Sequence, residues 1–321
     1  MTEIRSAMKN FILFVGSFLF QLLPAQLAAE SRVTVILDWF VNPDHAPLIV
    51  SKEKGYFKEK GLDVVFIAPA DPNDPPKLVA ANKAEIAVSY QPQLYTQVNA
   101  GLPLIRIGTL ISTPLNSLVV LANGPIKSIS DFKGKKIGFS VGGFEDALLK
   151  AMLNKSGLYL SDVELVNVNF SLSPALISGK VDGVIGAFRN FELNQMDIVK
   201  HPGRAFFPEE EGVPAYDELI LVANKHKLNN AQYRSFLDGL EKGVQFLINY
   251  PNESWKLFIG KYEALNDELN RRAWGATLPR FALRPAALDK ARYVRFGKFL
   301  KKQGLIEMVL PIENYAIELP N

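Results

Sequence analysis

An acidic residue and an indole stand side by side directly after the first apolar run, residues 33–37. Asp38 offers a carboxylate that accepts N–H groups, and Trp39 offers a flat face on which a ring can stack. The polar loop after them would lie beyond the carboxyl end of a strand, where open α/β sheets bind ligands. The pair therefore predicts a site for a planar ligand with N–H donors. In the competing interpretation, Asp38 caps the following helix and Trp39 is a residue of the hydrophobic core.

A second group of residues matches the pattern of a serine nucleophile. Residues 138–142 read Gly-Phe-Ser-Val-Gly between a predicted strand and helix, which would place Ser140 at a nucleophile elbow. Its acid and histidine partners would come from Asp182, Asp197, His201 and His226. However, no HGGG-type oxyanion loop precedes the motif. A loop of backbone N–H groups at a helix N-terminus, with Gly142 and Gly143, would instead suit a carbonyl or an anion, and a plain tight turn explains the string equally well.

The composition excludes several classes of chemistry. Cysteine is absent from all 321 residues, which excludes disulfides, thiol catalysis and cysteine-ligated metals. The three histidines are far apart, and no spacing typical of zinc or EF-hand calcium sites occurs. We expect no metal and no cofactor. A net charge of +3, from 36 basic and 33 acidic residues, does not predict the concentrated basic face of a nucleic-acid-binding protein.

The first 29 residues have the pattern of a secretory signal peptide. Arg5 and Lys9 precede the apolar run 11–23, and small residues follow up to Ala29, the expected cleavage site. A membrane anchor is the alternative, but the run is shorter than the ~20 residues that span a bilayer. No cysteine follows for lipid attachment, and no later segment is long and apolar enough to cross a membrane. We therefore expect a periplasmic protein.

The remaining sequence alternates strand-like and helix-like segments, which predicts an α/β fold with mainly parallel sheets covered by helices. One βαβαβ unit spans residues 33–109, and a second unit of the same outline has its strands within residues 136–187. Two nearly identical strings, 118–123 and 219–224, bracket the second unit and predict a hinge, unless they are two apolar strands that are alike by chance. The C-terminal segment should pack on the first unit, with helices at 232–247, 253–261 and 285–303.

Several strings together resemble a known family. Residues 38–48 read Asp-Trp-Phe-Val-Asn-Pro-Asp-His-Ala-Pro-Leu, and shorter matches follow at 54–57, 88–92, 131–138 and 186–192. They resemble the thiamine-pyrimidine-precursor group of periplasmic solute-binding proteins, the NMT1/THI5-like proteins, which are similar to fungal pyrimidine synthases. The resemblance covers residues 33–305. Its narrowest motifs are the start of the first string and the Arg-Asn-Phe-Glu element at 189–192.

The resemblance implies a two-lobed type II periplasmic binding fold with a two-strand hinge. Such a protein, a monomer, delivers its ligand to an inner-membrane ABC permease and its ATPase. The lobes would be residues 31–120 with 223–321, and residues 121–222. The ligand would be an aminopyrimidine of the formylaminopyrimidine or hydroxymethylpyrimidine type. With the glycine loop included, the expected ligand-binding residues are Asp38, Trp39, Asn42, His45, Tyr90, Gly142, Gly143, Phe188 and Glu192.

Within this set, Asp38 and Glu192 would hold the aminopyrimidine edge from opposite lobes while Trp39 stacks on the ring. A carboxylate can accept from both the exocyclic amine and a protonated ring nitrogen. For Glu192, a solvated position at a helix start is the alternative. The fungal enzymes carry a lysine and a histidine where this sequence has Ser89 and Gln93, so the resemblance implies a binding protein and not an enzyme. A sulfonate or nitrate-like anion is the alternative ligand, and it would need a cleft rich in arginine or backbone N–H groups.

Overall fold

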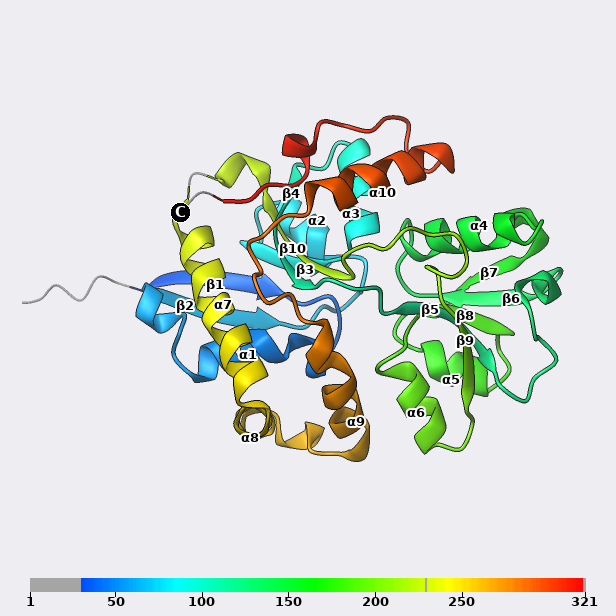
Figure 1. Cartoon of the computed structure of the whole chain (residues 1–321), viewed down its shortest axis with the longest axis horizontal. Helices are drawn as coiled ribbons and strands as arrows, with labels where there is room; N and C mark the ends of the chain where they lie inside the picture. Colours follow the sequence, from blue (N-terminus) through cyan, green and yellow to red (C-terminus); the bar gives the residue numbers. More distant parts are fainter. Residues whose placement is uncertain (1–29, 229, 320–321) are drawn as a thin grey trace, which may run out of the picture.

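Two five-stranded sheets, each with its own helices, lie side by side in the computed structural model, which describes residues 30–228 and 230–319 (Figure 1). The predicted signal peptide lies outside the described residues. The first sheet belongs to lobe I and has the order β2-β1-β3-β10-β4. Its strands are β1 (Ser31–Ile36), β2 (Leu62–Ile67), β3 (Ile86–Ser89), β4 (Leu104–Ile111) and β10 (Leu219–Asn224).

The second sheet, in lobe II, repeats the same plan with the order β7-β6-β8-β5-β9. Its strands are β5 (Asn116–Leu121), β6 (Lys136–Phe139), β7 (Glu164–Asn167), β8 (Gly183–Phe188) and β9 (Gly203–Phe206). The prediction of an α/β fold is confirmed, but each sheet is mixed and not mainly parallel. In each lobe the strand that enters from the other lobe, β10 or β5, pairs antiparallel with both of its neighbours.

The strand pairing divides the chain at other residues than we expected. The bounds 120 and 223 fall inside β5 and β10. Of the two similar strings that include them, 219–224 is the whole of β10, and 118–123 begins inside β5 and ends two residues beyond it. The chain crosses between the sheets in residues 112–115 and 207–218 instead. These crossings are joined at Glu218, whose Oε2 accepts the backbone N–H groups of Leu115 (2.5 Å) and Asn116 (2.9 Å). The apolar strings are sheet strands because buried pairing on both sides suits them better than an exposed hinge.

Helices cover the sheets and bring the C-terminal segment back over lobe I (Figure 1). Helix α7 packs on α1 and β2, as the sequence predicted. Helix α9, which the periodicity did not reveal, contacts both lobe I and helix α6 of lobe II. Helix α10 begins at Lys290 and not at 285, because the side chain of Asp289 caps it through the N–H of Arg292. The helices are α1 (Ala46–Glu53), α2 (Pro75–Ala80), α3 (Gln91–Asn99), α4 (Glu145–Lys155), α5 (Leu172–Ile177), α6 (Glu192–Ile198), α7 (Gln232–Asn249), α8 (Pro251–Lys261), α9 (Glu268–Thr277) and α10 (Lys290–Lys302).

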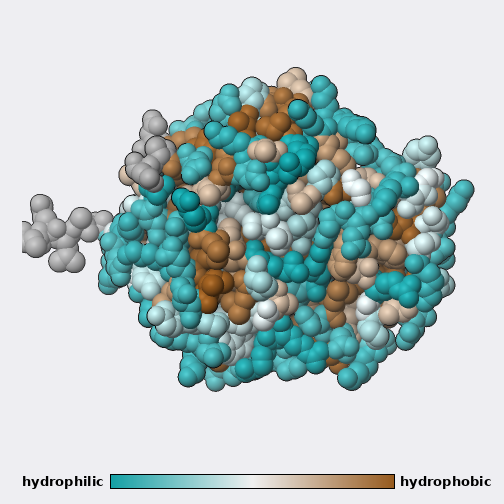
Figure 2. Space-filling view, viewed as in Figure 1, coloured by the Kyte–Doolittle hydropathy of each residue, from teal (hydrophilic) through white to brown (hydrophobic). Residues whose placement is uncertain are grey.

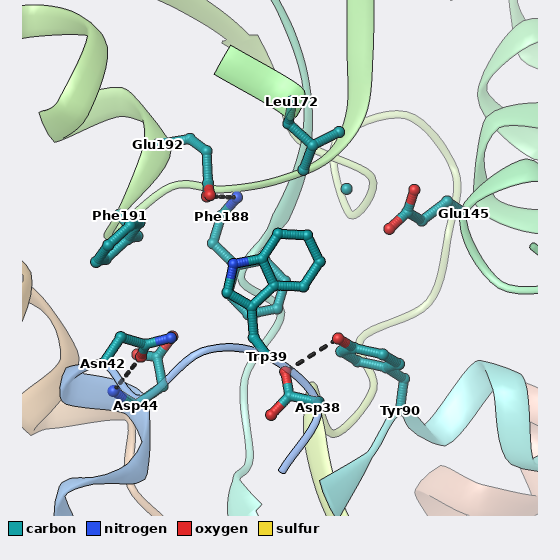
Figure 3. Close-up of a pocket in the computed structure, with 11 residues that line it drawn as sticks. Asp38, Trp39, Asn42, Asp44, Tyr90, Glu145, Leu172, Phe188, Phe191 and Glu192 are labelled. Atoms are coloured by element: carbon teal, nitrogen blue, oxygen red, sulfur yellow. Dashed lines mark hydrogen bonds between the residues drawn. The ribbon is translucent and has the colours of Figure 1, made fainter. Parts of the chain in front are cut away.

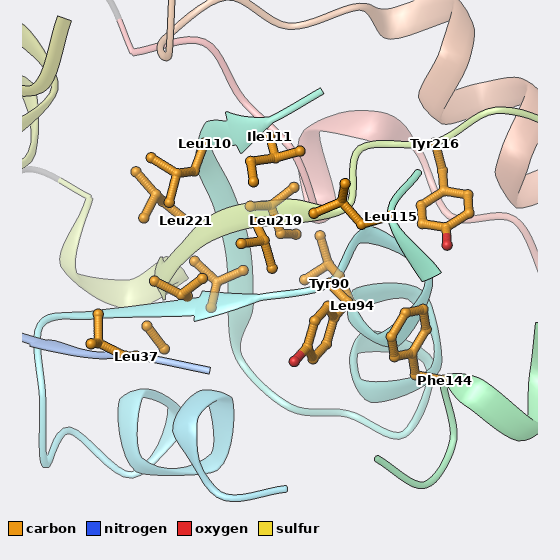
Figure 4. Close-up of a cluster of buried hydrophobic side chains, with 14 of the residues drawn as sticks. Leu37, Tyr90, Leu94, Leu110, Ile111, Leu115, Phe144, Tyr216, Leu219 and Leu221 are labelled. Carbon is orange, nitrogen blue, oxygen red and sulfur yellow. The ribbon is translucent and has the colours of Figure 1, made fainter. Parts of the chain in front are cut away.

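The largest hydrophobic core follows the lobe I sheet and continues across the lobe boundary into lobe II, where it includes Ile137 and Leu148. Figure 4 shows Leu37, Leu219 and Leu221 of this core, with Tyr90 of lobe I beside Phe144 of lobe II. Polar residues cover most of the face in Figure 2, with scattered apolar patches between them. Of the helices in the described ranges, none combines the length and the apolar character that a membrane crossing requires.

Candidate ligand-binding site

A pocket opens between the two lobes, where β1, β3 and β8 end (Figure 3). Lobe I contributes the loop after β1, a short 3-10 helix η1 (Pro43–His45) and the residue that precedes α3. Lobe II contributes β8 and the starts of α4, α5 and α6. This position beyond the strand ends is typical of ligand sites in open α/β sheets. The lining residues are Asp38, Trp39, Asn42, Asp44, Tyr90, Glu145, Leu172, Gly186, Phe188, Phe191 and Glu192.

The carboxylate of Asp38 is held from two sides within lobe I. Its Oδ1 lies 2.9 Å from His45 Nε2, and its Oδ2 accepts the hydroxyl of Tyr90 at 3.0 Å. Only 3 % of Asp38 is exposed. The carboxylate has the geometry of a preorganised acceptor, because both partners fix its orientation and leave lone pairs for a ligand. Asp38 therefore lies where the sequence predicted it, at the pocket wall.

His45 supports this wall from behind. It is fully buried and does not line the pocket. Its Nδ1 accepts the backbone N–H of Asn42 at 3.3 Å, so the proton of the neutral ring is on Nε2, where it is donated to Asp38. The amide oxygen of Asn42 accepts the N–H of Asp44 at 2.8 Å and caps η1. His45 is thus a positioning residue, while Asn42 belongs to the lining itself.

Glu192 faces the same pocket from lobe II. It is the first residue of α6, and its Oε2 accepts the backbone N–H of Phe188 at 2.6 Å. A helix N-terminus favours the carboxylate form, but Glu192 is 8 % exposed, and burial raises its pKa from 4.5 to about 8. Asp44 nearby adds to this rise through like-charge repulsion. Burial outweighs the helix terminus, so Glu192 is largely protonated at pH 7. The interpretation of Glu192 as a solvated helix start is therefore wrong.

Aromatic rings form the remaining walls and cross the lobe boundary. Figure 3 shows the indole of Trp39 in the middle of the site, and its ring packs edge-on against Phe170 of lobe II at 4.6 Å. The ring of Tyr90 stacks on Phe144 of lobe II, with centroids 4.5 Å apart. Phe188 meets the same ring edge-on at 6.5 Å. Trp39, Tyr90 and Phe188 all line the pocket, as the sequence predicted.

Two further acids, which sequence reasoning missed, also line the pocket. Burial raises the pKa of Asp44 from 3.8 to about 6 and that of Glu145 well above 4.5. Glu145 accepts the N–H of Ser140 at 2.7 Å and lies against Gly186, where φ is +100° and an added Cβ would be 2.3 Å from Oε1. Asp44 stood inside the motif that contains Asp38, which was an available signal. Glu145 resembled an ordinary helix-start acid in the sequence.

The predicted glycine loop does not reach the pocket. The N–H of Gly142 donates to Asn73 Oδ1 at 3.0 Å, and the carbonyl of Gly143 accepts from Thr96 Oγ1 at 3.3 Å. Asn73 and Thr96 belong to lobe I, so both glycines join the lobes instead of lining the pocket. Ser140 is fully buried and donates its hydroxyl to the carbonyl of Asn169. This buried hydroxyl lacks the exposure of an elbow nucleophile.

The ionisable side chains that line the pocket are mostly acids. Four of its lining residues are acids, namely Asp38, Asp44, Glu145 and Glu192, and within the described chain its lining includes no lysine or arginine. Polar groups that accept or share protons therefore surround an aromatic interior. Such a site suits a planar ligand with N–H donors and does not suit an anion.

Relatives of known name share most of this chain. A protein of Haemophilus influenzae, named as a candidate thiamine biosynthesis protein, is 52% identical over 97% of this chain and 100% of its own length. A formylaminopyrimidine-binding protein of Halalkalibacterium halodurans is 32% identical over 74% of this chain and 73% of its own. A 4-amino-5-hydroxymethyl-2-methylpyrimidine phosphate synthase of Saccharomyces cerevisiae is 24% identical over 77% and 76%.

Solved structures share the fold at low sequence identity. The alkanesulfonate-binding protein SsuA of Xanthomonas axonopodis, bound to MOPS, superposes with a TM-score of 0.70 at 14% identity, over 90% of this chain and 99% of that one. A Candida albicans protein described as having the generic periplasmic binding protein fold gives 0.69 at 16%, over 90% and 96%. These likenesses confirm the predicted fold class.

The family assignment follows from the sequence match that spans both lobes. Residues 42–254, which include strands of both sheets and most of the pocket, match the family described as NMT1/THI5 like. The chain therefore belongs to the NMT1/THI5-like family.

Proposed function

We propose that this protein is the solute-binding component of an ABC importer and that it binds a thiamine pyrimidine precursor, of the formylaminopyrimidine or hydroxymethylpyrimidine type, between its lobes. The observation that carries the proposal is the pairing of acids from both lobes around an indole, with no cationic side chain in the described lining. The name of the Halalkalibacterium halodurans relative supports the same cargo class.

An aminopyrimidine offers a ring nitrogen next to an exocyclic amine, and the two cleft walls suit this edge. A protonated Glu192 can donate to the ring nitrogen while its carbonyl oxygen accepts from the amine. Asp38, already oriented by His45 and Tyr90, can accept a further N–H. Trp39 provides the stacking face. Each step uses only hydrogen bonding and ring stacking, so no bond is made or broken in the cargo.

The expected affinity follows from the number of such contacts. A hydrogen bond to a charged group such as Asp38 contributes about 1.5–3 kcal/mol, and each bond to the neutral carboxyl of Glu192 contributes about 0.5–1.5 kcal/mol. Stacking of a base on an aromatic side chain contributes about 1–3 kcal/mol. Two acids, one stacking face and burial of the ring reach roughly 8–12 kcal/mol, which corresponds to micromolar to nanomolar binding. Because the acids lie on different lobes, the cargo favours the closed arrangement over an open one.

An anionic cargo is the alternative that the fold allows. The SsuA structure shows that this fold can hold MOPS, but its 14% identity carries no ligand over to this chain. A sulfonate would place negative charge among four buried acids, which is costly without a cationic partner. We therefore assign the aminopyrimidine class.

We propose a binding role without catalysis, although some relatives are named synthases. At the positions where the resemblance implies a cofactor lysine and a histidine, Ser89 and Gln93 are buried and bonded to each other at 3.1 Å. A hydroxyl and an amide supply neither an amine for a Schiff base nor an imidazole. Partners are accordingly an inner-membrane permease and its ATPase, and the compartment is the periplasm.

Isothermal titration tests this function directly. We expect hydroxymethylpyrimidine or formylaminopyrimidine to bind with micromolar or tighter affinity at pH 7, and an aliphatic sulfonate such as MOPS to give no heat. Tight binding of the sulfonate with no binding of either pyrimidine would refute the assignment. Product analysis after incubation with the pyrimidines should return them unchanged, and turnover would contradict the non-catalytic role.

A further inference from the structure

Three buried side chains from three separate segments meet at the edge of the pocket. Asp44 comes from η1 of lobe I, Asn190 from the turn between β8 and α6 of lobe II, and Thr277 from the end of α9. They are 2 %, 1 % and 0 % exposed. Asn190 Nδ2 donates to Asp44 Oδ1 at 2.6 Å, Thr277 Oγ1 donates to the same oxygen at 2.9 Å, and Asn190 Nδ2 lies 2.7 Å from Thr277 Oγ1. One carboxylate oxygen therefore joins lobe I to lobe II and to α9.

The other oxygen of Asp44 is differently placed. Asp44 lines the pocket, and its Oδ2 is buried with no hydrogen-bond partner among residues 30–228 and 230–319. A buried acceptor without a donor is unfavourable, more so for a group that is ionised. One oxygen of Asp44 is thus held by contacts that join the lobes, and the other is a buried acceptor without a donor on a side chain that lines the pocket.

We propose that Asp44 is a further cargo-binding residue that couples occupancy of the pocket to closure of the lobes. This inference rests on the proposed function for the identity of the cargo, a ligand with N–H donors. The cargo donates to Oδ2 while Asn190 and Thr277 hold Oδ1. Opening the cleft separates Asn190 from Asp44, so the site that receives the cargo is complete only when the lobes are closed.

Helix α9 has a second contact with lobe II that makes a useful contrast. Arg272 Nη1 lies 2.7 Å from Asp197 Oδ2 on α6, but both side chains are largely exposed, with 40% and 61% of their surface accessible. Exposed ion pairs of this kind contribute little and are screened by salt. The buried group of Asp44, Asn190 and Thr277 is therefore the contact that decides how α9 affects closure, with Asn190 and Thr277 as positioning residues.

The coupling can be measured by labelling, since the native chain has no cysteine. Cysteines at Lys180 of lobe II and Asn252 of α8, both exposed, would carry spin labels that report the distance between lobes. Without added ligand, we expect Thr277→Val to raise the open population above that of the unmutated, labelled protein. An unchanged distance distribution would overturn the role of this contact in closure. Asn123→Ala, at an exposed position of lobe II, is the matched control.

A double-mutant cycle with hydroxymethylpyrimidine tests the coupling to cargo. Asn190→Ala should weaken binding about tenfold in the native background but less than about twofold beside Asp44→Asn, because both changes break one linked contact. Independent, multiplying effects would overturn the coupling. If the native protein binds neither pyrimidine, the proposed cargo is wrong, and the label distances of the free protein still decide whether the contact closes the lobes.

Discussion

Asp38 on the lobe I wall and Glu192 on the lobe II wall are both buried, but their oxygens have different surroundings. Asp38 has partners on both oxygens, and both partners, His45 and Tyr90, belong to its own lobe. Glu192 accepts one backbone N–H through Oε2, and burial dominates its protonation. The lobe I acid is oriented whether or not the lobes meet. The lobe II acid owes much of its burial to closure.

This difference divides the work of recognition between the lobes. Under the proposed function, lobe I presents an organised acceptor and a stacking face, so it can receive the cargo first. Lobe II then adds a carboxyl group whose pKa of about 8 keeps it protonated at neutral pH.

The largest expected loss of affinity comes from replacing Asp38, the oriented acceptor of lobe I. Asp38→Asn replaces one carboxylate oxygen by an NH2 group. That group can no longer accept a hydrogen bond from His45 or Tyr90, or from the cargo. We expect binding of hydroxymethylpyrimidine to weaken about 100-fold, which is ~2.7 kcal/mol and corresponds to the loss of one or two charge-assisted hydrogen bonds. Isothermal titration measures this change.

Asp63→Asn is the control for that experiment, since Asp63 is an exposed acid on β2 of the same lobe. It should bind as the native protein does. Equal affinities for Asp38→Asn and the native protein, with matching melting temperatures, would remove Asp38 from the site.

The protonated carboxyl of Glu192 on the lobe II wall predicts that affinity for the cargo depends on pH. Because binding uses the protonated form of Glu192, affinity should be nearly constant around pH 7 and fall about tenfold per pH unit above 8. Glu192→Gln keeps one donor and one acceptor but does not titrate, so its affinity should be lower at pH 7 and flat up to pH 9. A native profile that is flat to pH 9 would show that the proton of Glu192 is not needed.

The same variant should stabilise the free protein at high pH. A carboxyl whose folded pKa is raised from 4.5 to about 8 contributes no penalty below pH 4.5, and it destabilises the fold progressively as pH rises toward 8. Glu192→Gln removes this penalty, so its unfolding free energy should exceed that of the native protein by on the order of 3 kcal/mol at pH 8 and match it at pH 4.5. Thermal melts at both pH values measure this, with Glu210→Gln as the exposed control.

Sequence reasoning named Asp38 and Trp39 because they follow a recognisable strand, and it named Tyr90 and Glu192 through the family resemblance. Positions that follow a strand lie at one edge of a sheet, so local patterns suffice to bring them together. Sequence reasoning did not identify Asp44 and Glu145, because their burial depends on contacts with the opposite lobe. A local sequence pattern carries no information about such contacts. The loop of Gly142 and Gly143 was recognised, but its polar groups are satisfied by Asn73 and Thr96, more than forty residues away.

The assignment of strands to sheets also depended on contacts between distant parts of the chain. The strings at β5 and β10 were found as strands, but which sheet each one joins depends on pairing with residues far along the chain. β5 pairs with β8 and β9, and β10 with β3 and β4, in both cases antiparallel. Long-range pairing of this kind has no signature within the strand itself. The lobe bounds were therefore misplaced inside these strands, although the α/β fold class was confirmed.

The smallest expected effect concerns the orientation of Asp38. Tyr90→Phe removes the hydroxyl that donates to Oδ2 at 3.0 Å but keeps the ring that stacks on Phe144. One orienting hydrogen bond is lost while the carboxylate and its bond to His45 remain, so affinity for hydroxymethylpyrimidine should fall about fivefold to tenfold. Tyr159→Phe, at a residue that is 68% exposed, is the control and should change nothing. A loss as large as that of Asp38→Asn would mean that Tyr90 contacts the cargo directly, and the contrast between an organised and a protonated wall would then have to include a third polar contact.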